Sequence, residues 1–351
     1  MNSVIGSELY RQDVEYVKGL PLQWERLENS SFVISGATGM IGSFLIDVLM
    51  SKFPTGIKIF ALGRNAEKAR ERFGDLLDDD RLEFVSCDIN KALDDSALGD
   101  VQADYMFHFA SNTHPMAYST NPIGTVTANI IGTNNLLEYG ASHGNKRFIF
   151  ASSVEVYGEN RGDTEKFSED YLGYIDCNTL RAGYPESKRA GEALCQAYIS
   201  QKDMDVVIAR LSRTYGPTLL KTDTKALSQF INKGVSGEDI VLKSEGNQLY
   251  SYSYVADSVA GVFYCLLAGE KGEAYNVSDA ASDITLKELS QIIADYVGTK
   301  VVFELPDAAE ARGYSTATKA LLDPAKINAL GYKAGYDIKK GLQRTIDMLK
   351  A

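Results

Sequence analysis

The chain has 351 residues, 44% of them apolar and 24% charged, which is close to the average for globular proteins. This composition excludes a disordered, fibrous or disulfide-stapled protein, and the length predicts two domains or one domain with a smaller addition. The formal net charge of −11 argues against nucleic-acid partners, because an acidic surface repels phosphate backbones. No run of about 18 apolar residues is present, so we expect no membrane-spanning helix.

Metal-ligating residues are scarce and scattered. The four cysteines form no CxxC pair, and the chain has only three histidines, so we expect no metal site. Unpaired cysteines predict reduced thiols and a cytoplasmic protein. The first fifteen residues are partly charged and contain no apolar signal segment, which agrees with that expectation.

Strand and helix patterns alternate along most of the chain. Residues 1–29 predict a short helical extension. Apolar, β-rich segments at 32–34, 57–62, 82–85, 105–109, 147–150 and 206–209 then predict strands, with helix-period segments between them. This alternation predicts parallel strands with crossover helices, an α/β doubly wound, Rossmann-like sheet.

After Pro217 the pattern loosens and the apolar segments become short and mixed. We therefore expect a dinucleotide-binding domain at 30–216, with a returning segment near 250–278. Residues 217–351 are expected to form mainly a smaller substrate-binding domain.

A glycine-rich turn lies between the first strand and the first helix. Its GxxGxxG spacing allows a tight turn and lets the backbone approach a pyrophosphate, while the following helix supplies amide donors. The alternative is a turn that only packs the helix on the strand. We predict an NAD or NADP site with contacts from Gly36, Thr38, Gly39, Met40, Ile41 and Gly42.

The end of the second strand selects between the two cofactors. An acidic residue there accepts from the ribose hydroxyls of NAD, and an arginine accommodates the extra phosphate of NADP. The segment carries Arg64 and no acid, which favours NADP, although Arg64 could simply be a solvated residue at a helix start. Asp88 and Ile89, after the third strand, are expected beside the adenine.

A YxxxK motif places Tyr184 and Lys188 on one helix face, where the lysine can act on the phenol. A tyrosine base near neutrality needs a pKa about three units below its ordinary value, and a charge about 4 Å away supplies roughly that. The same spacing recurs at 198/202, 296/300 and 336/340, so the motif alone is weak. Tyr184 is favoured because it follows the fifth strand, whose end carries Ser153. Ser153 is either a substrate-orienting hydroxyl or a turn cap.

Together these motifs resemble the extended short-chain dehydrogenase/reductase family, the NAD-dependent epimerase/dehydratase group, over nearly all of the chain from about residue 30. The resemblance implies a catalytic set of Ser153, Tyr184 and Lys188 and a homodimer built on helices near 123–141 and 184–201. The further segments that match are 104–110, 129–137 and 210–217. In and directly after these segments, the resemblance implies cofactor contacts from Phe109, Ala110, Ser111 and Asn129.

Within this family the chain looks most like the UDP-glucuronate decarboxylases, with three departures. Val154 stands where sugar 4,6-dehydratases carry an aspartate acid, which disfavours dehydration. Tyr250 replaces an arginine that the decarboxylases are expected to use on the substrate. Arg213 replaces an asparagine beside the diphosphate, where a guanidinium can bind phosphate in a forked geometry or form a structural salt bridge.

The resemblance therefore implies an enzyme that acts on a nucleotide-diphosphate sugar. Tyr184 exchanges the hydroxyl proton, Ser153 orients the reacting oxygen, and Lys188 lowers the tyrosine pKa and holds the nicotinamide ribose. Glu155 is a candidate second acid or base, or a structural carboxylate. The expected substrate contacts are Tyr118, Arg213, Lys225, Gln229, Tyr250 and Arg312.

Three functions compete at this point. Transient oxidation with return of the hydride gives epimerisation or decarboxylation through a keto-sugar. Net reduction of a keto-sugar nucleotide consumes NADPH and is favoured by Arg64. A non-catalytic dinucleotide sensor is the third, and the intact tyrosine, lysine and serine argue against it.

Overall fold

The computed structural model describes residues 2–93, 98–99, 101–113, 115–219, 223–304 and 317–351. Seven parallel strands form its largest sheet, in the order β10-β6-β5-β4-β1-β2-β3. The strands are β1 Ser30–Ser35, β2 Ile57–Gly63, β3 Leu82–Ser86, β4 Tyr105–His108, β5 Arg147–Ser153, β6 Val206–Leu211 and β10 Ala274–Val277. The doubly wound sheet and all six predicted strands are confirmed.

The strand order reverses between β1 and β4. The chain adds β2 and β3 on one side of β1, then returns to add β4, β5 and β6 on the other. In open sheets of this kind, ligands bind at the carboxyl ends of the strands beside such a reversal. The ends of β1, β4 and β5 are therefore the place to look for a site.

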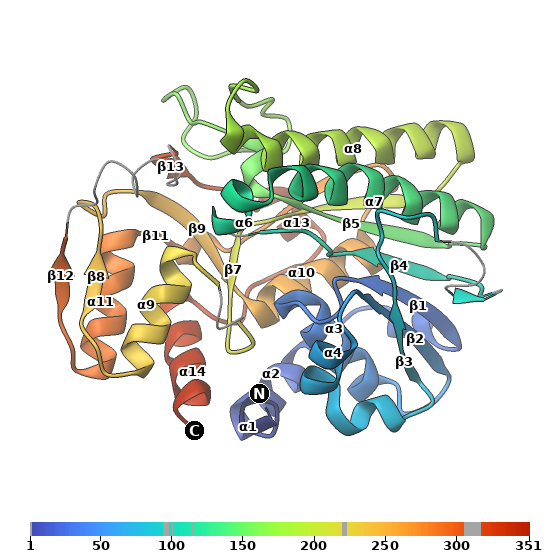
Figure 1. The fold of residues 1–351 in the computed structure, drawn as a ribbon, viewed down its shortest axis with the longest axis horizontal. Helices are drawn as coiled ribbons and strands as arrows, with labels where there is room; N and C mark the ends of the chain where they lie inside the picture. Colours follow the sequence, from blue (N-terminus) through green and yellow to red (C-terminus); the bar gives the residue numbers. More distant parts are fainter. Residues whose placement is uncertain (1, 94–97, 100, 114, 220–222, 305–316) are drawn as a thin grey trace.

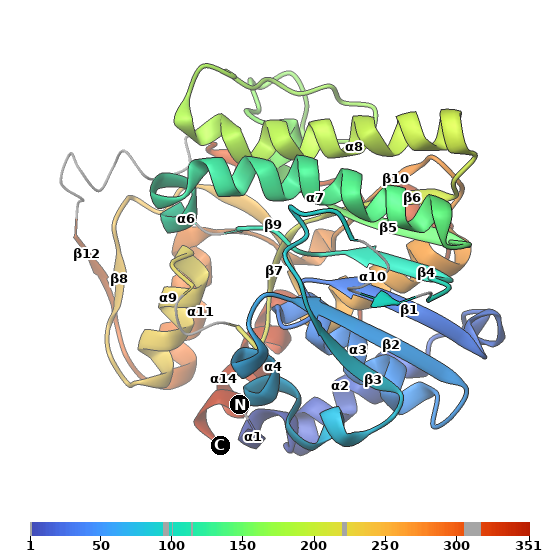
Figure 2. The same cartoon turned by 45° about the vertical axis from the view of Figure 1, so that its right-hand side comes forward.

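Both faces of the sheet are buried, as the continuous apolar strands require. Phe32 and Ile34 of β1 belong to one core and Val33 to the other. Figures 1 and 2 show α7 and α8 side by side over one face, with α3 and α10 on the opposite face. These helices are α3 Met40–Lys52, α7 Pro122–Ser142, α8 Gly183–Lys202 and α10 Val255–Ala268.

After β6, the described residues add small sheets and the helices α9, α11 and α14, besides α10 and α13. Strand β9 (Leu249–Tyr254) pairs with β7, β11 and β13, and β8 pairs with β12. Figures 1 and 2 place α9, α11, β8 and β12 on the side of the molecule where α7 and α8 begin. The bounds are β7 Arg213–Tyr215, β8 Ile240–Leu242, β11 Asp283–Thr285, β12 Val301–Phe303, β13 Lys319–Ala320, α9 Ala226–Val235, α11 Leu286–Val297 and α14 Ile338–Lys350.

Strand β10 pairs with β6 and so carries the chain back into the large sheet after these small sheets. The division of the chain into domains at residue 217 stays a prediction. The remaining elements are α1 Asn2–Ile5, α4 Ala66–Phe73, α6 Pro115–Thr120 and α13 Ala325–Ala329, with short 3₁₀ turns at 24–27, 74–78, 154–157, 180–182 and 280–282.

The N-terminal extension is helical, as predicted, and its helix α2 (Glu8–Lys18) is tied to α10 and α14. The Tyr16 hydroxyl donates to Asp257 of α10 at 2.8 Å. Asp13 accepts from Arg344 of α14 at 2.9 Å. Because these carboxylates are buried and hydrogen-bonded, the extension is part of the folded core. Among the residues described, no helix is long and apolar enough to cross a membrane.

Candidate active site

The glycine turn packs directly against the end of β4. Gly36 has a φ of +70°, and a Cβ added to it would lie 2.6 Å from the amide nitrogen of Ala110. A Cβ on Gly42 would lie 2.6 Å from the carbonyl oxygen of Gly36. Glycine is therefore required at both positions, because any side chain would push the turn away from β4 or the helix away from the turn.

The start of α3 is suited to a pyrophosphate. Gly39 is the N-cap of this 13-residue helix and offers no side chain to its first amide groups. Those amides and the helix dipole suit an anion, which the family cofactor would supply. Asn129 of α7 is fully buried, donates to Ser187 at 2.9 Å, and has no partner for its side-chain oxygen. These features fit a dinucleotide; Thr38 lies in the glycine turn, and Met40 and Ile41 are the first two residues of α3.

The ends of β2 and β3 carry the other predicted cofactor residues. Arg64 follows β2 and is exposed, one residue before Asn65, which caps α4. Asp88 accepts from the Asn90 amide at 3.1 Å. Ile89 is buried and packs on α7, where a Cβ on Gly132 would lie 2.6 Å from its side chain. Phe109, Ala110 and Ser111 follow β4 and are partly buried.

Ser153, Tyr184 and Lys188 meet at the carboxyl end of β5. Tyr184 is the second residue of α8 and Lys188 lies one turn further on; both side chains are buried. Ser153 ends β5 and hydrogen-bonds with the Tyr184 phenol. Its hydroxyl also accepts from the Glu155 amide at 3.2 Å, so Ser153 both caps the following turn and faces the tyrosine.

Burial sets the charge states of this pair. It raises the pKa of Tyr184 to about 12; the Ser153 hydrogen bond opposes the shift and the charge of Glu155 adds to it. Burial lowers the pKa of Lys188 to about 8, against the effect of Glu192. The ammonium donates to the Ala151 carbonyl at 2.7 Å. At Tyr184, desolvation therefore outweighs the effects of the neighbouring groups. That Lys188, helped by a positive nicotinamide, lowers this pKa stays a prediction.

Glu155 lies between two arginines. One carboxylate oxygen is 2.7 Å from Nη2 of Arg181, and the other is 3.9 Å from Nη2 of Arg213. The Arg213 guanidinium lies 3.6 Å from the centre of the Tyr250 ring. Two of the three family departures, Arg213 and Tyr250, are thus in direct contact, and we call the residues Glu155, Arg181, Arg213 and Tyr250 the front cluster.

The front cluster reaches the catalytic tyrosine through Tyr118 of α6. The Arg181 guanidinium lies 4.7 Å from the centre of the Tyr118 ring, and that ring stacks on Tyr184 with centroids 5.1 Å apart. Nη1 of Arg181 and Nη1 of Arg213 are both buried without a hydrogen-bond partner. Because an unsatisfied buried donor is costly, these two atoms indicate a place for ligand oxygens.

Arg181 belongs to the front cluster, although the sequence does not single it out as a site residue. The sequence signal for it is its position three residues before Tyr184, and the structure places it in the 3₁₀ turn at 180–182, directly before α8. Only the fold shows that its side chain turns toward Glu155.

The predicted substrate residues Tyr250, Lys225 and Gln229 make further contacts. The Tyr250 hydroxyl donates to the Ala317 carbonyl at 2.6 Å, which fixes the ring under Arg213. Lys225 and Gln229 lie at the start of α9 and contact their own segment, Asp223 at 3.6 Å and the Thr224 carbonyl at 2.7 Å. Arg312 lies outside the described residues.

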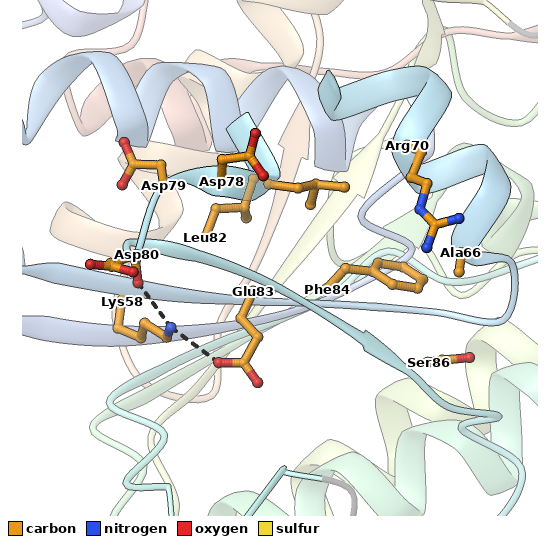
Figure 3. A pocket seen from close by; sticks show the side chains of 11 residues that line it. Lys58, Ala66, Arg70, Asp78, Asp79, Asp80, Leu82, Glu83, Phe84 and Ser86 are labelled. Carbon is orange, nitrogen blue, oxygen red and sulfur yellow. Dashed lines mark hydrogen bonds and ion pairs between the residues drawn. The ribbon is translucent and has the colours of Figure 1, made fainter. Parts of the chain in front are cut away.

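A cavity of about 560 Å³ lies at the β3 edge of the sheet, away from this site (Figure 3). Lys58 crosses it to contact Glu83 at 3.0 Å and the Asp80 carbonyl at 2.9 Å. It contains none of the predicted site residues, so we assign it no part in the function. Within the described ranges, no group of three histidines, cysteines or carboxylates is placed to hold a metal ion.

Comparison with known proteins agrees with this geometry. Residues 32–278 match the model of the NAD dependent epimerase/dehydratase family, and the chain belongs to that family. A UDP-glucuronic acid decarboxylase 1 of Xenopus tropicalis is 28% identical over 321 residues, which cover 91% of this chain and 72% of the relative. UDP-glucuronic acid decarboxylase 6 of Arabidopsis thaliana is 28% identical over 90% of this chain and 87% of its own length.

Solved structures show the same fold. The UDP-glucuronic acid 4-epimerase of Bacillus cereus, in complex with UDP-glucuronic acid and NAD, matches with a TM-score of 0.78 and 22% identity over 91% of this chain and 99% of that structure. The dTDP-glucose 4,6-dehydratase of Bacillus anthracis, in complex with NAD, matches with a TM-score of 0.76 and 20% identity over 91% and 96%.

Proposed function

We propose that this member of the NAD dependent epimerase/dehydratase family modifies a nucleotide-activated sugar by hydride transfer assisted by Tyr184 and Lys188. The proposal rests on one observation: Ser153, Tyr184 and Lys188 come together at the end of β5, beside the strand reversal, and the tyrosine and the lysine are buried there. The names of the relatives, UDP-glucuronic acid decarboxylases, support the substrate class.

The residues divide the chemistry between them. A bound nicotinamide dinucleotide supplies a hydride acceptor or donor, held by the glycine turn and the start of α3. Tyr184 takes the proton from the reacting sugar hydroxyl, or returns it, at its phenolic oxygen. Ser153 orients that hydroxyl by hydrogen bonding. Lys188 provides a positive charge behind the tyrosine and holds the ribose.

The front cluster forms the substrate end of the site. We assign the two unpartnered guanidinium nitrogens of Arg181 and Arg213 to substrate oxygens, which they bind as charge-assisted donors. Glu155 is the second acid or base for a step that follows the oxidation. Val154 carries no proton donor, so elimination of water is disfavoured and a keto intermediate would lead to epimerisation or decarboxylation.

Net reduction of a keto-sugar nucleotide by NADPH is a second candidate. Arg64 favours it, because the exposed side chain follows β2 where a 2′-phosphate would lie. On the same ground we propose NADP rather than NAD as the cofactor. The non-catalytic sensor is disfavoured by the retained catalytic residues.

Two measurements on the purified protein separate these functions. The first is mass spectrometry of any cofactor released on denaturation. The second is product analysis after incubation with UDP-glucuronic acid, UDP-glucose, dTDP-glucose or a keto-sugar nucleotide, each with NAD, NADP or NADPH. A retained cofactor and a changed sugar without net cofactor consumption support internal recycling. Stoichiometric NADPH oxidation with a keto-sugar supports the reductase, and cofactor binding without turnover of any sugar contradicts the proposal.

We also propose a homodimer built on α7 and α8, which lie side by side on one face. On α7, Ile123 is 77% exposed and Ile131 is 42% exposed. Ala193 and Ala197 of α8 are exposed as well, so both helices present apolar residues to solvent. Light scattering at micromolar concentration tests this, and a monomer mass would contradict it.

A further inference from the structure

Behind the catalytic helix lies a second arginine–carboxylate group that the proposed mechanism does not use. Glu192 of α8 follows Lys188 by one helical turn. Its carboxylate accepts from Nε and Nη2 of Arg210 at 3.0 and 2.7 Å and from the Ser152 hydroxyl at 2.5 Å. Arg210 lies on β6 and Ser152 on β5, so Glu192 joins the catalytic helix to two strands of the sheet. We call Ser152, Glu192 and Arg210 the rear network.

The rear network is closed by further hydrogen bonds. Nη1 of Arg210 donates to the Tyr157 hydroxyl and to the Glu169 carbonyl, both at 2.8 Å. The guanidinium and the carboxylate are therefore held in place by groups from several elements. Because such a network is fixed, the distance between Glu192 and Lys188 is fixed with it.

Lys188 needs a neighbouring negative charge. Its side chain is 2% exposed, so burial opposes its positive charge. Its ammonium donates to the Ala151 carbonyl, which is neutral and does not balance that charge. The titratable groups near it are Tyr184, Glu192 and Cys195 on its own helix and His108 on β4, and the Phe150 ring on β5 lies 4.9 Å from the ammonium. Burial raises the pKa of Tyr184, which keeps the phenol neutral. Burial keeps Cys195 and His108 neutral, since the pKa of the thiol is raised and that of the imidazole is lowered. Glu192 is the anion among them.

We propose that Glu192 is a positioning residue that keeps Lys188 charged inside the protein, with Arg210 limiting the strength of its field. Lys188, Glu192 and Arg210 together carry a net charge of +1 when Glu192 is ionised. This excess positive charge lies beside Tyr184. Lys188 can then stabilise the developing phenolate without being neutralised by an unshielded carboxylate. The inference rests on the proposed function, because it assumes that a charged lysine assists the tyrosine.

Two substitutions are expected to move the lysine titration in opposite directions. Glu192→Gln leaves two buried cations together, so the pKa of Lys188 should fall by about one unit or more from about 8. Arg210→Gln leaves Glu192 without its partner, so the pKa of Lys188 should rise by a similar amount. A purely structural network would lower activity or stability in both variants without this reversal of sign.

The direct measurement is NMR of ¹⁵N-labelled lysine side chains as a function of pH, with the Lys188 signal assigned through Lys188→Arg. Glu192→Asp keeps the charge and should keep the midpoint. Glu186→Gln is the matched control, since Glu186 lies on the same helix but pairs at the surface with Arg189, at 3.7 Å. The pH dependence of cofactor affinity in the same variants is a second readout.

The outcomes separate the inference from the proposed function. Opposite shifts in Glu192→Gln and Arg210→Gln support the inference even if no nucleotide sugar is turned over, which would count against the proposed function alone. Unchanged Lys188 midpoints in both folded variants, or shifts of the same sign, would overturn the inference while leaving any measured turnover intact. If Glu192→Gln does not fold, a failure of Arg210→Gln to raise the midpoint overturns it.

Discussion

The front cluster and the rear network use the same chemistry to different ends. Each contains a glutamate held by arginine. The front cluster adjoins Tyr184 through Tyr118, and the rear network adjoins Lys188 along α8. In the rear network every side-chain nitrogen of Arg210 has a partner. In the front cluster one terminal nitrogen of Arg181 and one of Arg213 are buried without any.

This difference separates a structural group from a binding group. A closed network stabilises one arrangement and has nothing left to offer a ligand. An open network retains buried donors without partners. The free-energy cost of burying them is offset only when ligand oxygens bind to them. Substitutions in the rear network should therefore change stability and lysine titration, and substitutions in the front cluster should change substrate binding.

The largest expected effect lies between the two groups, at Tyr184. Tyr184→Phe should lower turnover by about 10²- to 10⁴-fold, because it removes the proton carrier on the reacting oxygen. Cofactor affinity and melting temperature should change little, since the ring and its stacking on Tyr118 remain. Steady-state kinetics with the active nucleotide sugar checks this, and turnover at the parental rate would remove Tyr184 from the mechanism.

The sequence predicted the sheet well because its strands are short apolar segments between helix-period segments, and local patterning decides both. It also predicted the glycine turn and the Tyr184–Lys188 pair. It did not predict the partners of Glu155, because Arg181 and Arg213 reach it from 26 and 58 positions further along the chain. Nor did it predict the raised pKa of Tyr184, since the degree of burial follows from packing rather than from spacing.

The front cluster is tested by Arg213→Ala. If Arg213 supplies a charge-assisted hydrogen bond to the substrate, its loss should weaken nucleotide-sugar binding by about ten- to a hundredfold, with cofactor affinity unchanged. Arg161→Ala is the matched control, because that exposed arginine also lies over a tyrosine ring, Tyr174, at 4.2 Å. Titration calorimetry measures both; equal affinities in the parent and Arg213→Ala would make Arg213 a structural residue.

The substitution Tyr250→Arg tests the second residue of the contact between Arg213 and Tyr250. The ring now supports Arg213 and is fixed by the Ala317 carbonyl. A second guanidinium there would restore the family residue beside the existing one, so binding should persist and favour a more anionic sugar. The ratio of affinities for UDP-glucuronic acid and UDP-glucose is the measurement, and complete loss of binding to a folded variant would contradict the assignment.

Arg64 belongs to neither the front cluster nor the rear network, and its substitution tests the cofactor preference. Arg64 is exposed, and Arg64→Asp should shift the cofactor preference from NADP toward NAD by about tenfold or more, because a carboxylate repels the 2′-phosphate and accepts from a free 2′-hydroxyl. Dissociation constants for both cofactors, before and after the change, decide this. Identical ratios would place Arg64 outside the cofactor site and leave the absence of an acid after β2 unexplained.

The smallest expected effect belongs to the rear network. Ser152→Ala removes one of the hydrogen bonds to Glu192 but leaves both bonds from Arg210. The loss of one bond to a buried carboxylate should lower the free energy of unfolding by about 1–2 kcal/mol. Substrate affinity should stay within about twofold, because no donor of the front cluster changes. Denaturant unfolding and calorimetry on Ser152→Ala and Arg213→Ala together test the distinction. If Ser152→Ala weakens substrate binding as much as Arg213→Ala does, the two groups act as one and the separation between them is wrong.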